Sequence, residues 1–320
     1  MPNVKDFHQG ESFIAYNADC IEIARDMDDD SVGFIIYSPP FSSLYTYSND
    51  ERDMGNSKSD GEFFQHFGYL IKEMYRVLKP GRLMAVHCMN LPTSKQNDGF
   101  IGVRDFRGDL IRAFQGEGFV YHSEVCIWKD PVVAMQRTKA LGLLHKTIKK
   151  DSSMSRMGIP DYLVVMRKPG ENERPISGEL AYYVGDNPAP GFSSVERPDG
   201  SLYWVVDHEN ATNIDTWQRY ASPVWDDINQ TRTLQYQNAR ASDDERHICP
   251  LQLDVIERSM QLWSNPDDVV FSPFMGIGSE GYVALQMGRK FIGAELKESY
   301  FDLAKRNLDE AENVKQAEMF

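Results

Sequence analysis

The sequence predicts an α/β fold built around a mainly parallel sheet, and three observations support this. Residues 32–37 form an unbroken apolar run, which is typical of a strand covered by helices on both faces. Residues 63–78 carry apolar side chains at helical spacing and are followed by Lys79-Pro80-Gly81, a helix stop signal. Strand-like and helix-like segments alternate near both ends of the chain, as expected when helices pack against a parallel sheet.

Seven strands and six helices are expected in this alternating order. The strands are identified by unbroken or alternating apolar runs, and the helices by apolar residues that repeat with the helical period. The expected strands cover residues 11–18, 32–37, 83–88, 119–128, 162–167, 269–271 and 291–295. The expected helices cover residues 21–27, 63–78, 107–116, 251–263, 280–287 and 300–308.

The regular patterning weakens over residues 169–246, where prolines and glycines recur. This segment is expected to be an insertion of short strands and loops, or a small subdomain. Residues 1–168 and 247–320 would then be two parts of one core. A chain of 320 residues with 41% hydrophobic residues can form one such core and still carry an insertion.

Charge and cysteine content limit the classes of function. The net charge of -14 disfavours a uniformly basic nucleic-acid-binding protein, so any nucleic-acid-binding surface must be local. The four cysteines form no Cys-x-x-Cys pair, which argues against a zinc ribbon or a disulfide framework. The sequence contains neither a long apolar span nor a signal-peptide pattern. The protein is therefore expected to be cytoplasmic, without a membrane partner.

Residues 274–281 read Phe-Met-Gly-Ile-Gly-Ser-Glu-Gly, a G-x-G-x-x-G loop between an expected strand and helix. A dinucleotide site would need several strands after this loop, but only one follows. The remaining strands must come from the N-terminal part, which is a circular rearrangement of the usual order. The same glycine turn can approach a nucleoside without phosphates, and Glu295, at the end of the next strand, can accept hydrogen bonds from ribose hydroxyls. S-adenosylmethionine (SAM) fits such a site.

The strand at residues 32–37 ends in Ser38-Pro39-Pro40-Phe41. Two prolines fix the backbone and remove two N–H donors, so their carbonyl groups remain as acceptors. Ser38 Oγ and the Pro39 carbonyl can accept the two hydrogens of an exocyclic base amine, and Phe41 offers a ring for stacking of a flipped base. The turn is therefore the candidate catalytic centre, with direct methyl transfer and no covalent enzyme intermediate.

With these motifs, the chain resembles the β class of DNA amino-methyltransferases, in which the catalytic turn precedes the cofactor loop. The resemblance covers most of the chain outside the insertion. Its matching segments are Asn17-Ala18-Asp19-Cys20, Ser38-Pro39-Pro40-Phe41, Val77-Leu78-Lys79-Pro80-Gly81, Trp225, residues 247–253, Phe274-x-Gly276-x-Gly278, Gly288-Arg289 and Ile292-Gly293-Ala294-Glu295.

The resemblance implies a Rossmann-like, doubly wound, seven-stranded SAM-dependent methyltransferase core, circularly permuted and with an inserted target-recognition region. It also implies that Asp19 lies near the adenine of SAM, that the turn at Phe274, Gly276 and Gly278 contacts the methionine part, and that Glu295 binds the ribose. One position departs from the family. Ser272 stands where an Asp usually enters the glycine turn, which removes a carboxylate near the ammonium group of the cofactor, although Ser272 can still accept a hydrogen bond.

Two other chemistries are disfavoured by the sequence. Methylation of cytosine C5 needs a thiolate presented just after a proline, whereas Cys249 precedes Pro250. The seven histidines include no H-E-x-x-H pair, and His247-x-Cys249 alone is a weak metal-binding signal, so no metal is expected.

The charge distribution predicts where DNA binds. Residues 129–168 contain nine Lys or Arg against three acids, whereas residues 169–246 contain six Arg against fourteen acids. The basic segment is therefore the candidate DNA-facing surface, and the acidic insertion is a scaffold, a subunit interface or a reader of bases. An ordinary solvated helix face is the competing interpretation of the basic segment. The candidate DNA-binding residues are Arg137, Lys139, Lys146, Lys149, Lys150 and Arg156.

The loop at 42–60, with Tyr45 and Tyr47, is either a cover for the flipped base or merely a mobile loop.

The sequence thus predicts a site-specific methyltransferase that acts on double-stranded DNA, with cytosine N4 favoured because Ser-Pro-Pro-aromatic resembles that branch of the family. Adenine N6 remains an alternative, since both amines present the same two donors. A second alternative is a catalytically silent DNA-binding subunit of a modification complex, which the replacement at Ser272 would permit. A homodimer is compatible with this organisation.

Overall fold

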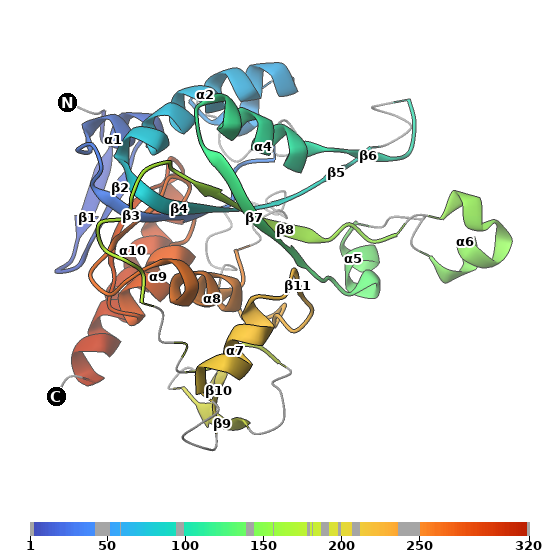
Figure 1. Ribbon diagram of the computed structural model, residues 1–320. Coiled ribbons are helices and arrows are strands. Elements are labelled where there is room, and N and C mark those ends of the chain that lie inside the picture. Colours follow the sequence, from blue (N-terminus) through green and yellow to red (C-terminus); the bar gives the residue numbers. More distant parts are fainter. Residues whose placement is uncertain are drawn as a thin grey trace.

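The computed structural model describes residues 3–41, 52–57, 59–93, 99–138, 144–155, 157–177, 180, 182–186, 192–197, 200–206, 212–235 and 250–318. Within this part of the chain, nine strands form the central sheet (Figure 1). In spatial order they are β1 (Asp6–Gln9), β2 (Phe13–Asn17), β13 (Lys290–Ala294), β12 (Val269–Ser272), β3 (Val32–Tyr37), β4 (Leu78–Met89), β8 (Asp161–Arg167), β7 (Val120–Ile127) and β11 (Val224–Trp225). All seven predicted strands are present, and β1 and β11 add one strand at each edge.

The sheet is mainly parallel, as predicted. Strands β2, β13, β12, β3 and β4 run parallel to one another. Strand β8 is antiparallel to both β4 and β7, β11 is parallel to β7, and β1 is antiparallel to β2. The C-terminal strands β12 and β13 therefore lie between the N-terminal strands β2 and β3. This order brings the carboxyl ends of β3, β12 and β13 to the same edge of the sheet.

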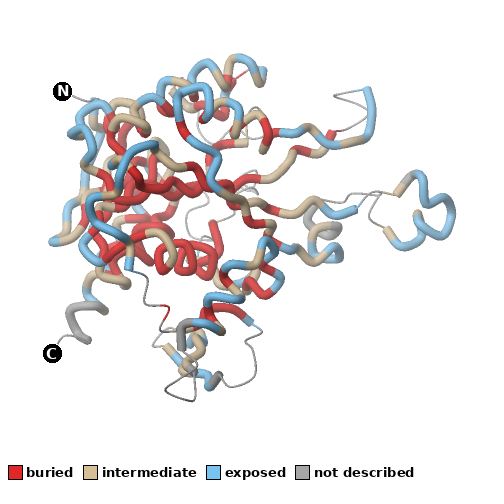
Figure 2. Tube along the Cα trace, viewed as in Figure 1, coloured by how far each residue is buried: buried red, intermediate tan, exposed pale blue. Residues whose placement is uncertain are grey.

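Helices cover both faces of the sheet (Figure 1). Helices α1 (Cys20–Asp26), α2 (Asp60–Val77) and α4 (Phe106–Gly116) lie on one face, and α8 (Leu253–Trp263), α9 (Ser279–Gln286) and α10 (Glu298–Glu318) lie on the other. A hydrophobic core lies on each face of the sheet. Alternate residues of β3 pack into one core or the other, because successive side chains of a strand point to opposite faces. Phe34 and Ile36 pack into the core between the sheet and helices α8 to α10, whereas Ile35 and Tyr37 pack into the core between the sheet and α2. This double burial explains the unbroken apolar run of β3 and the buried centre seen in Figure 2.

The predicted helix stop at Lys79-Pro80-Gly81 has a different structure from the one expected. Helix α2 already ends at Val77, and these three residues belong to β4, which begins at Leu78. The pairing of β3 with β4 shifts register between Val32 and Phe34. Gly81 adopts φ +73°, and a Cβ there would lie 2.6 Å from the backbone nitrogen of Asn172, so only glycine fits.

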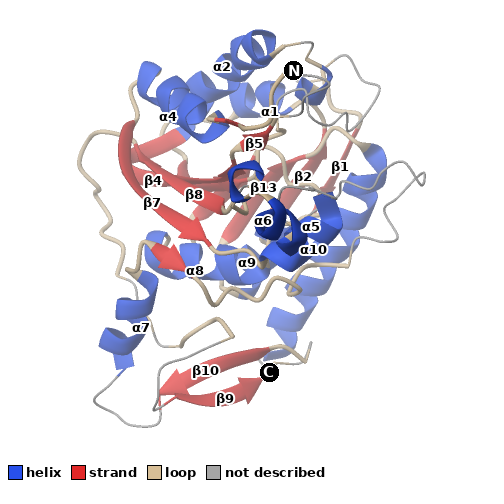
Figure 3. Ribbon diagram, turned by 90° about the vertical axis from the view of Figure 1, so that its right-hand side faces the viewer, coloured by secondary structure: helices blue, strands red, loops and turns tan. Residues whose placement is uncertain are grey.

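Residues 169–246 contain the predicted short strands β9 (Phe192–Glu196) and β10 (Leu202–Val206), which form an antiparallel pair. The segment also contains an unpredicted helix, α7 (Thr212–Tyr220), and β11, which pairs with β7 in the central sheet. Figure 3 shows α7 and the β9–β10 pair apart from the central sheet, on the side of the sheet that α8 and α9 cover. Arg258 of α8 fastens the segment to the core through an ion pair with Asp227 at 2.8 Å and a hydrogen bond to the Val184 carbonyl at 2.8 Å.

The segment between β7 and β8, for which the sequence analysis predicts a basic surface but no defined helices, contains α5 (Pro131–Thr138) and α6 (His145–Lys150). Short strands β5 (Leu91–Pro92) and β6 (Val103–Arg104) form a separate antiparallel pair, and two 3-10 helices cover Met54–Asn56 and Ser152–Met154. None of the helices in the described ranges has the length and hydropathy needed to cross a membrane.

Candidate active site

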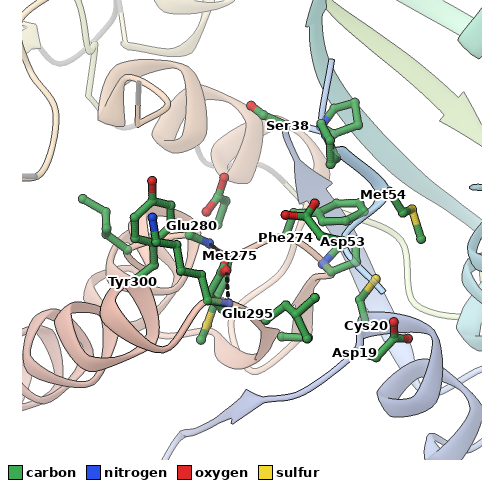
Figure 4. Close-up of a pocket in the computed structure, with 18 of the residues that line it drawn as sticks. Asp19, Cys20, Ser38, Asp53, Met54, Phe274, Met275, Glu280, Glu295 and Tyr300 are labelled. Atoms are coloured by element: carbon green, nitrogen blue, oxygen red, sulfur yellow. Dashed lines mark hydrogen bonds between the residues drawn. The ribbon is translucent and has the colours of Figure 1, made fainter. Parts of the chain in front are cut away.

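One pocket at the carboxyl edge of the sheet brings the predicted catalytic turn and cofactor loop together (Figure 4). The predicted residues that line it are Asp19, Ser38, Pro39, Pro40, Phe41, Phe274, Gly276 and Glu295. These residues come from segments more than 200 positions apart, and they meet because β12 and β13 lie beside β3. Ser272 and Gly278 lie outside the lining.

Gly276 and Gly278 have separate roles in the glycine turn. Both adopt positive φ, at +53° and +88°, a region that favours glycine. A Cβ at Gly276 would meet nothing within 4 Å, so this position leaves open space. A Cβ at Gly278 would instead lie 3.3 Å from the Cβ of Ala304. Gly276 therefore shapes the pocket wall, whereas Gly278 lets α9 begin close to α10.

Glu295 joins the two turns that follow β12 and β13. Its Oε2 accepts a hydrogen bond from the Gly276 N–H at 3.1 Å, and its Oε1 accepts one from the Lys297 N–H at 2.8 Å. Burial raises the pKa of Glu295 to about 7, although these backbone hydrogen bonds oppose the shift. A carboxylate has about four acceptor sites, so capacity remains for donors from a ligand.

Asp19 has a structural role in addition to its place in the pocket wall. Its Oδ1 accepts hydrogen bonds from the Ile21 and Glu22 N–H groups at 2.8 and 3.2 Å, and it thereby caps α1. Burial raises the pKa of Asp19 above its ordinary value, opposed by the two backbone hydrogen bonds. The residue that the family places near the adenine is thus also the N-cap of α1.

Position 272 carries no acid, but the pocket is lined by a further acidic residue, Glu280, that the sequence analysis did not identify. The Ser272 side chain is fully buried in β12, and its Oγ has no hydrogen-bond partner in the described structure. Glu280, in the first turn of α9, lines the pocket, and burial raises its pKa to about 8. In Figure 4 its carboxyl group lies between Glu295 and Ser38. Its position inside the G-x-G-x-x-G loop was the available signal.

The catalytic turn is held by aromatic packing. Pro39 and Pro40 are buried, whereas Ser38 and Phe41 are partly exposed. The Phe41 ring meets Phe106 edge-on at 6.3 Å between centroids. Tyr37, the residue before the turn, contacts the ring of Phe274 at 5.8 Å between centroids and so connects the catalytic turn with the glycine turn.

Behind Ser38 lies a chain of polar groups that the sequence analysis did not identify. Ser38 Oγ is 2.9 Å from His87 Nδ1, and His87 Nε2 is 3.1 Å from Asp161 Oδ2. The other oxygen of Asp161, Oδ1, is 2.6 Å from Lys129 Nζ. His87 and Asp161 are both buried. A histidine inside the apolar run at residues 83–88 was the only sequence signal for this chain of contacts.

Three of the predicted DNA-binding residues lie on α6. Lys146, Lys149 and Lys150 are exposed on this short helix, which lies away from the central sheet in Figure 1. The side chain of Arg137, together with Lys139 and Arg156, falls outside the described residues, as do Tyr45, Tyr47, His247 and Cys249. Lys129, which was counted in the basic segment, forms an ion pair with Asp161.

Comparison with known proteins gives consistent matches. A profile of the DNA methylase family (N6_N4_Mtase) matches residues 32–306. The type II methyltransferase M.BglII of Bacillus subtilis is 23% identical over 291 residues, which cover 90% of this chain and 67% of that protein. The DNA adenine methyltransferase YhdJ of Escherichia coli (strain K12) is 31% identical over 128 residues, which cover 39% of this chain and 40% of that protein.

Two solved structures share the fold. The PvuII DNA methyltransferase (cytosine-N4-specific) aligns with a TM-score of 0.61 and 16% identity, over 98% of this chain and 97% of that one. TTHA0409 from Thermus thermophilus, complexed with S-adenosyl-L-methionine, aligns with a TM-score of 0.58 and 18% identity, over 92% of this chain and 93% of that one.

The shared sheet, with helices on both faces, defines the fold as a Rossmann-like α/β fold. Because the family profile spans most of the 320 residues, the chain belongs to the N6/N4 family of DNA methylases. It is therefore a SAM-dependent DNA methyltransferase.

Proposed function

We propose that this enzyme transfers the methyl group of SAM to the exocyclic amine of a base flipped out of double-stranded DNA, with cytosine N4 as the favoured target. The observation that carries this proposal is the meeting of Ser38, Gly276 and Glu295 in one pocket. Ser38, a hydrogen-bond acceptor for an amine, therefore faces the same pocket as the glycine turn and Glu295, which would bind the nucleoside part of SAM.

The residues lining the pocket fit the cofactor. Open space at Gly276 allows close approach to the backbone, and Glu295 retains acceptor capacity for ribose hydroxyls. Glu280 lies between Glu295 and Ser38, which is where the methionine part would connect the ribose to the reactive methyl group. We assign the cofactor's ammonium group to Glu280, which replaces the acid missing at Ser272. When bound, SAM supplies an electrophilic methyl carbon on a sulfonium centre.

The catalytic turn would prepare the amine for attack. The lone pair of an exocyclic amine is delocalised into the base, so the nitrogen must become pyramidal before it reacts. Hydrogen-bond acceptors at Ser38 Oγ and the Pro39 carbonyl favour this change, and Phe41 supports the flipped base by stacking. The attack on the methyl carbon is direct, without a covalent enzyme intermediate.

The preference for cytosine over adenine rests on the motif and on one enzyme with the same fold. Ser38-Pro39-Pro40-Phe41 is of the type found in the cytosine-N4 branch, and the PvuII enzyme with the same fold is cytosine-N4-specific. The similarity to YhdJ, a DNA adenine methyltransferase, keeps adenine N6 as the second candidate. Similarity to the type II enzyme M.BglII further suggests a role in restriction-modification.

The DNA would lie across the carboxyl edge of the sheet, with the exposed lysines of α6 on its phosphates. Residues 169–246 are proposed as the target-recognition or interface subdomain, inserted between the catalytic part (1–168) and the SAM-binding part (247–320). Support comes from the acidic character of the insertion and from its own β9–β10 pair and α7.

Single-molecule sequencing of DNA from cells that express the protein tests this function. The expected result is one modified base in a defined sequence context, present with the wild-type protein and absent with Ser38→Ala. Unmodified DNA, combined with no SAM binding in calorimetry, would favour the alternative of a catalytically silent DNA-binding subunit.

A further inference from the structure

Ser38 is the first member of a row of contacts that crosses four strands of the sheet. Ser38 follows β3, His87 lies in β4, Asp161 begins β8, and Lys129 follows β7. The successive distances are 2.9, 3.1 and 2.6 Å. Only Ser38 among these four lines the pocket. His87 and Asp161 are buried, so they can act on a substrate in the pocket only through Ser38.

The negative charge of Asp161 determines which nitrogen of His87 carries the proton. Burial alone would raise the pKa of Asp161, but its contacts with His87 and Lys129 outweigh burial and lower the pKa below its ordinary value. The Lys129 ammonium group, 2.6 Å from Oδ1, favours the carboxylate whatever the protonation of His87. The carboxylate lies 3.1 Å from His87 Nε2, and its negative charge favours the imidazole tautomer that carries its proton on Nε2. His87 Nδ1 then has a lone pair, and the Ser38 hydroxyl must donate to it.

This direction determines what Ser38 can do. With its hydrogen held by His87 Nδ1, the hydroxyl presents only lone pairs to the pocket. An exocyclic amine placed there can donate to Ser38 Oγ. If the hydroxyl rotated freely, it could also donate towards the substrate, which would oppose the geometry needed for attack.

We propose that His87 and Asp161 form a proton relay behind Ser38. As the amine nitrogen bonds to the methyl carbon, the carbon–sulfur bond breaks and its electron pair stays on sulfur. The nitrogen, now cationic, gives one proton to Ser38 Oγ, and the hydroxyl proton passes to His87 Nδ1. Asp161 stabilises the resulting imidazolium, and the proton later leaves to solvent when the product departs. This inference rests on the proposed amine methylation, in which His87 and Asp161 are positioning residues.

A buried His–Asp pair can also be purely structural, so the test must separate the two roles. The decisive experiment is a double-mutant cycle on Ser38→Ala and His87→Gln, measured as the single-turnover rate of methyl transfer to DNA. Each single variant is expected to be slower by about 100- to 10,000-fold, the range of general acid–base catalysis. Because His87 acts through Ser38, the double variant should be no slower than the slower single variant.

Asp161→Asn provides a second variant with nearly unchanged volume. Its amide can donate to His87 Nε2, which would leave the imidazole proton on Nδ1 and reverse the hydrogen bond to Ser38. A loss of rate of similar size is expected, with the SAM dissociation constant unchanged, whereas the melting temperature should fall because the buried ion pair with Lys129 is lost. His122→Gln, the same substitution at an exposed histidine of β7, is the matched control and should keep the wild-type rate.

Multiplicative effects in the cycle, or a wild-type rate in Asp161→Asn, would overturn the relay. Failure of the relay is distinguishable from failure of the proposed function. If the wild-type enzyme transfers no methyl group to an exocyclic amine, the proposed function is wrong. If the wild-type enzyme does so and the cycle is additive, only the relay is wrong.

Discussion

The N–H of Gly276 donates a hydrogen bond to Glu295 Oε2 at 3.1 Å, across 19 positions of the sequence. This bond fixes the glycine turn after β12 against the turn after β13, with the pocket beside both. The glycine turn and Glu295 are separate motifs in the sequence. They form one binding site because the neighbouring parallel strands β12 and β13 end at the same edge of the sheet.

Glu295→Gln should weaken SAM binding. The amide keeps the volume but loses the charge, and its nitrogen cannot accept from a backbone N–H or a ribose hydroxyl. Loss of a hydrogen bond to a charged group costs about 1.5 to 3 kcal/mol, which corresponds to an increase of about 10- to 100-fold in the dissociation constant measured by calorimetry. Glu298→Gln, at an exposed position three residues away, is the control. Unchanged affinity in Glu295→Gln would place the ribose elsewhere.

Glu280 should release a proton when SAM binds. With a pKa raised to about 8, it is mostly protonated at pH 7 in the free protein, and an ammonium partner would favour its carboxylate. Calorimetry at pH 7 in buffers of different ionisation enthalpy should therefore show more proton release for the wild type than for Glu280→Gln. 5′-Methylthioadenosine, which lacks the ammonium group, should bind both proteins alike. Equal proton release by both proteins with SAM would exclude the assigned role.

The raised pKa of Glu280 also predicts a pH dependence of stability. A carboxyl group with a higher pKa in the folded state than in the unfolded state stabilises the fold fully below pH 4.5, and this contribution is lost as the pH rises through about 8. The free energy of unfolding of the wild type should therefore fall, relative to Glu280→Gln, by roughly 2 to 4 kcal/mol over this window. Urea denaturation without SAM at several pH values measures the difference. Parallel pH profiles for the two proteins would show that Glu280 is not desolvated.

Substitutions in the catalytic turn should separate transfer from cofactor binding. Ser38→Ala or Phe41→Ala should slow methyl transfer by at least about 100-fold and leave the SAM dissociation constant nearly unchanged, because these side chains are assigned to the base. Phe41→Ala should also lower the melting temperature, since its ring packs on Phe106. If cofactor affinity falls as much as the rate, the turn has been assigned to the wrong ligand.

The lysines of α6 should bind phosphates without reading sequence. Replacing Lys146, Lys149 and Lys150 with Gln should weaken binding of cognate and scrambled duplexes alike, and lower the slope of the salt dependence by about 0.9 for each lysine that neutralises a phosphate. The matched control replaces three other exposed lysines, Lys72, Lys79 and Lys290, with Gln. Lys79 and Lys290 lie at the starts of β4 and β13, at the opposite edge of the sheet. This control should keep the wild-type slope. The same slope in both variants would reject α6 as the DNA-facing surface.

Local patterns predicted most of the fold. The run at residues 32–37 matches β3 because burial on both faces leaves no room for polar side chains, and the helix at 63–78 corresponds to α2 within three residues at its start and one at its end. The short helices α5 and α6 were missed because neither carries the apolar stripe of a packed helix. Strand β11 was missed because two residues give no periodicity.

The site was predicted where its residues are adjacent in sequence, as in the catalytic and glycine turns. His87, Asp161 and Lys129 come together only through the pairing of β4, β8 and β7, and no local pattern carries that information. Ser272 and Glu280 illustrate the same limit. The family position identified the missing acid, but only the structure places Glu280 in the pocket wall and Ser272 outside it.

The most direct test of amine methylation is nucleoside analysis of DNA incubated with the purified enzyme and isotopically labelled SAM. The proposed function predicts label in N4-methylcytosine, with none in C5-methylcytosine, and its loss in Ser38→Ala. Label in N6-methyladenine would retain the mechanism and change the base. Label in C5-methylcytosine, or equal label with Ser38→Ala, would contradict the assignment of the Ser38 turn as the centre of amine methylation.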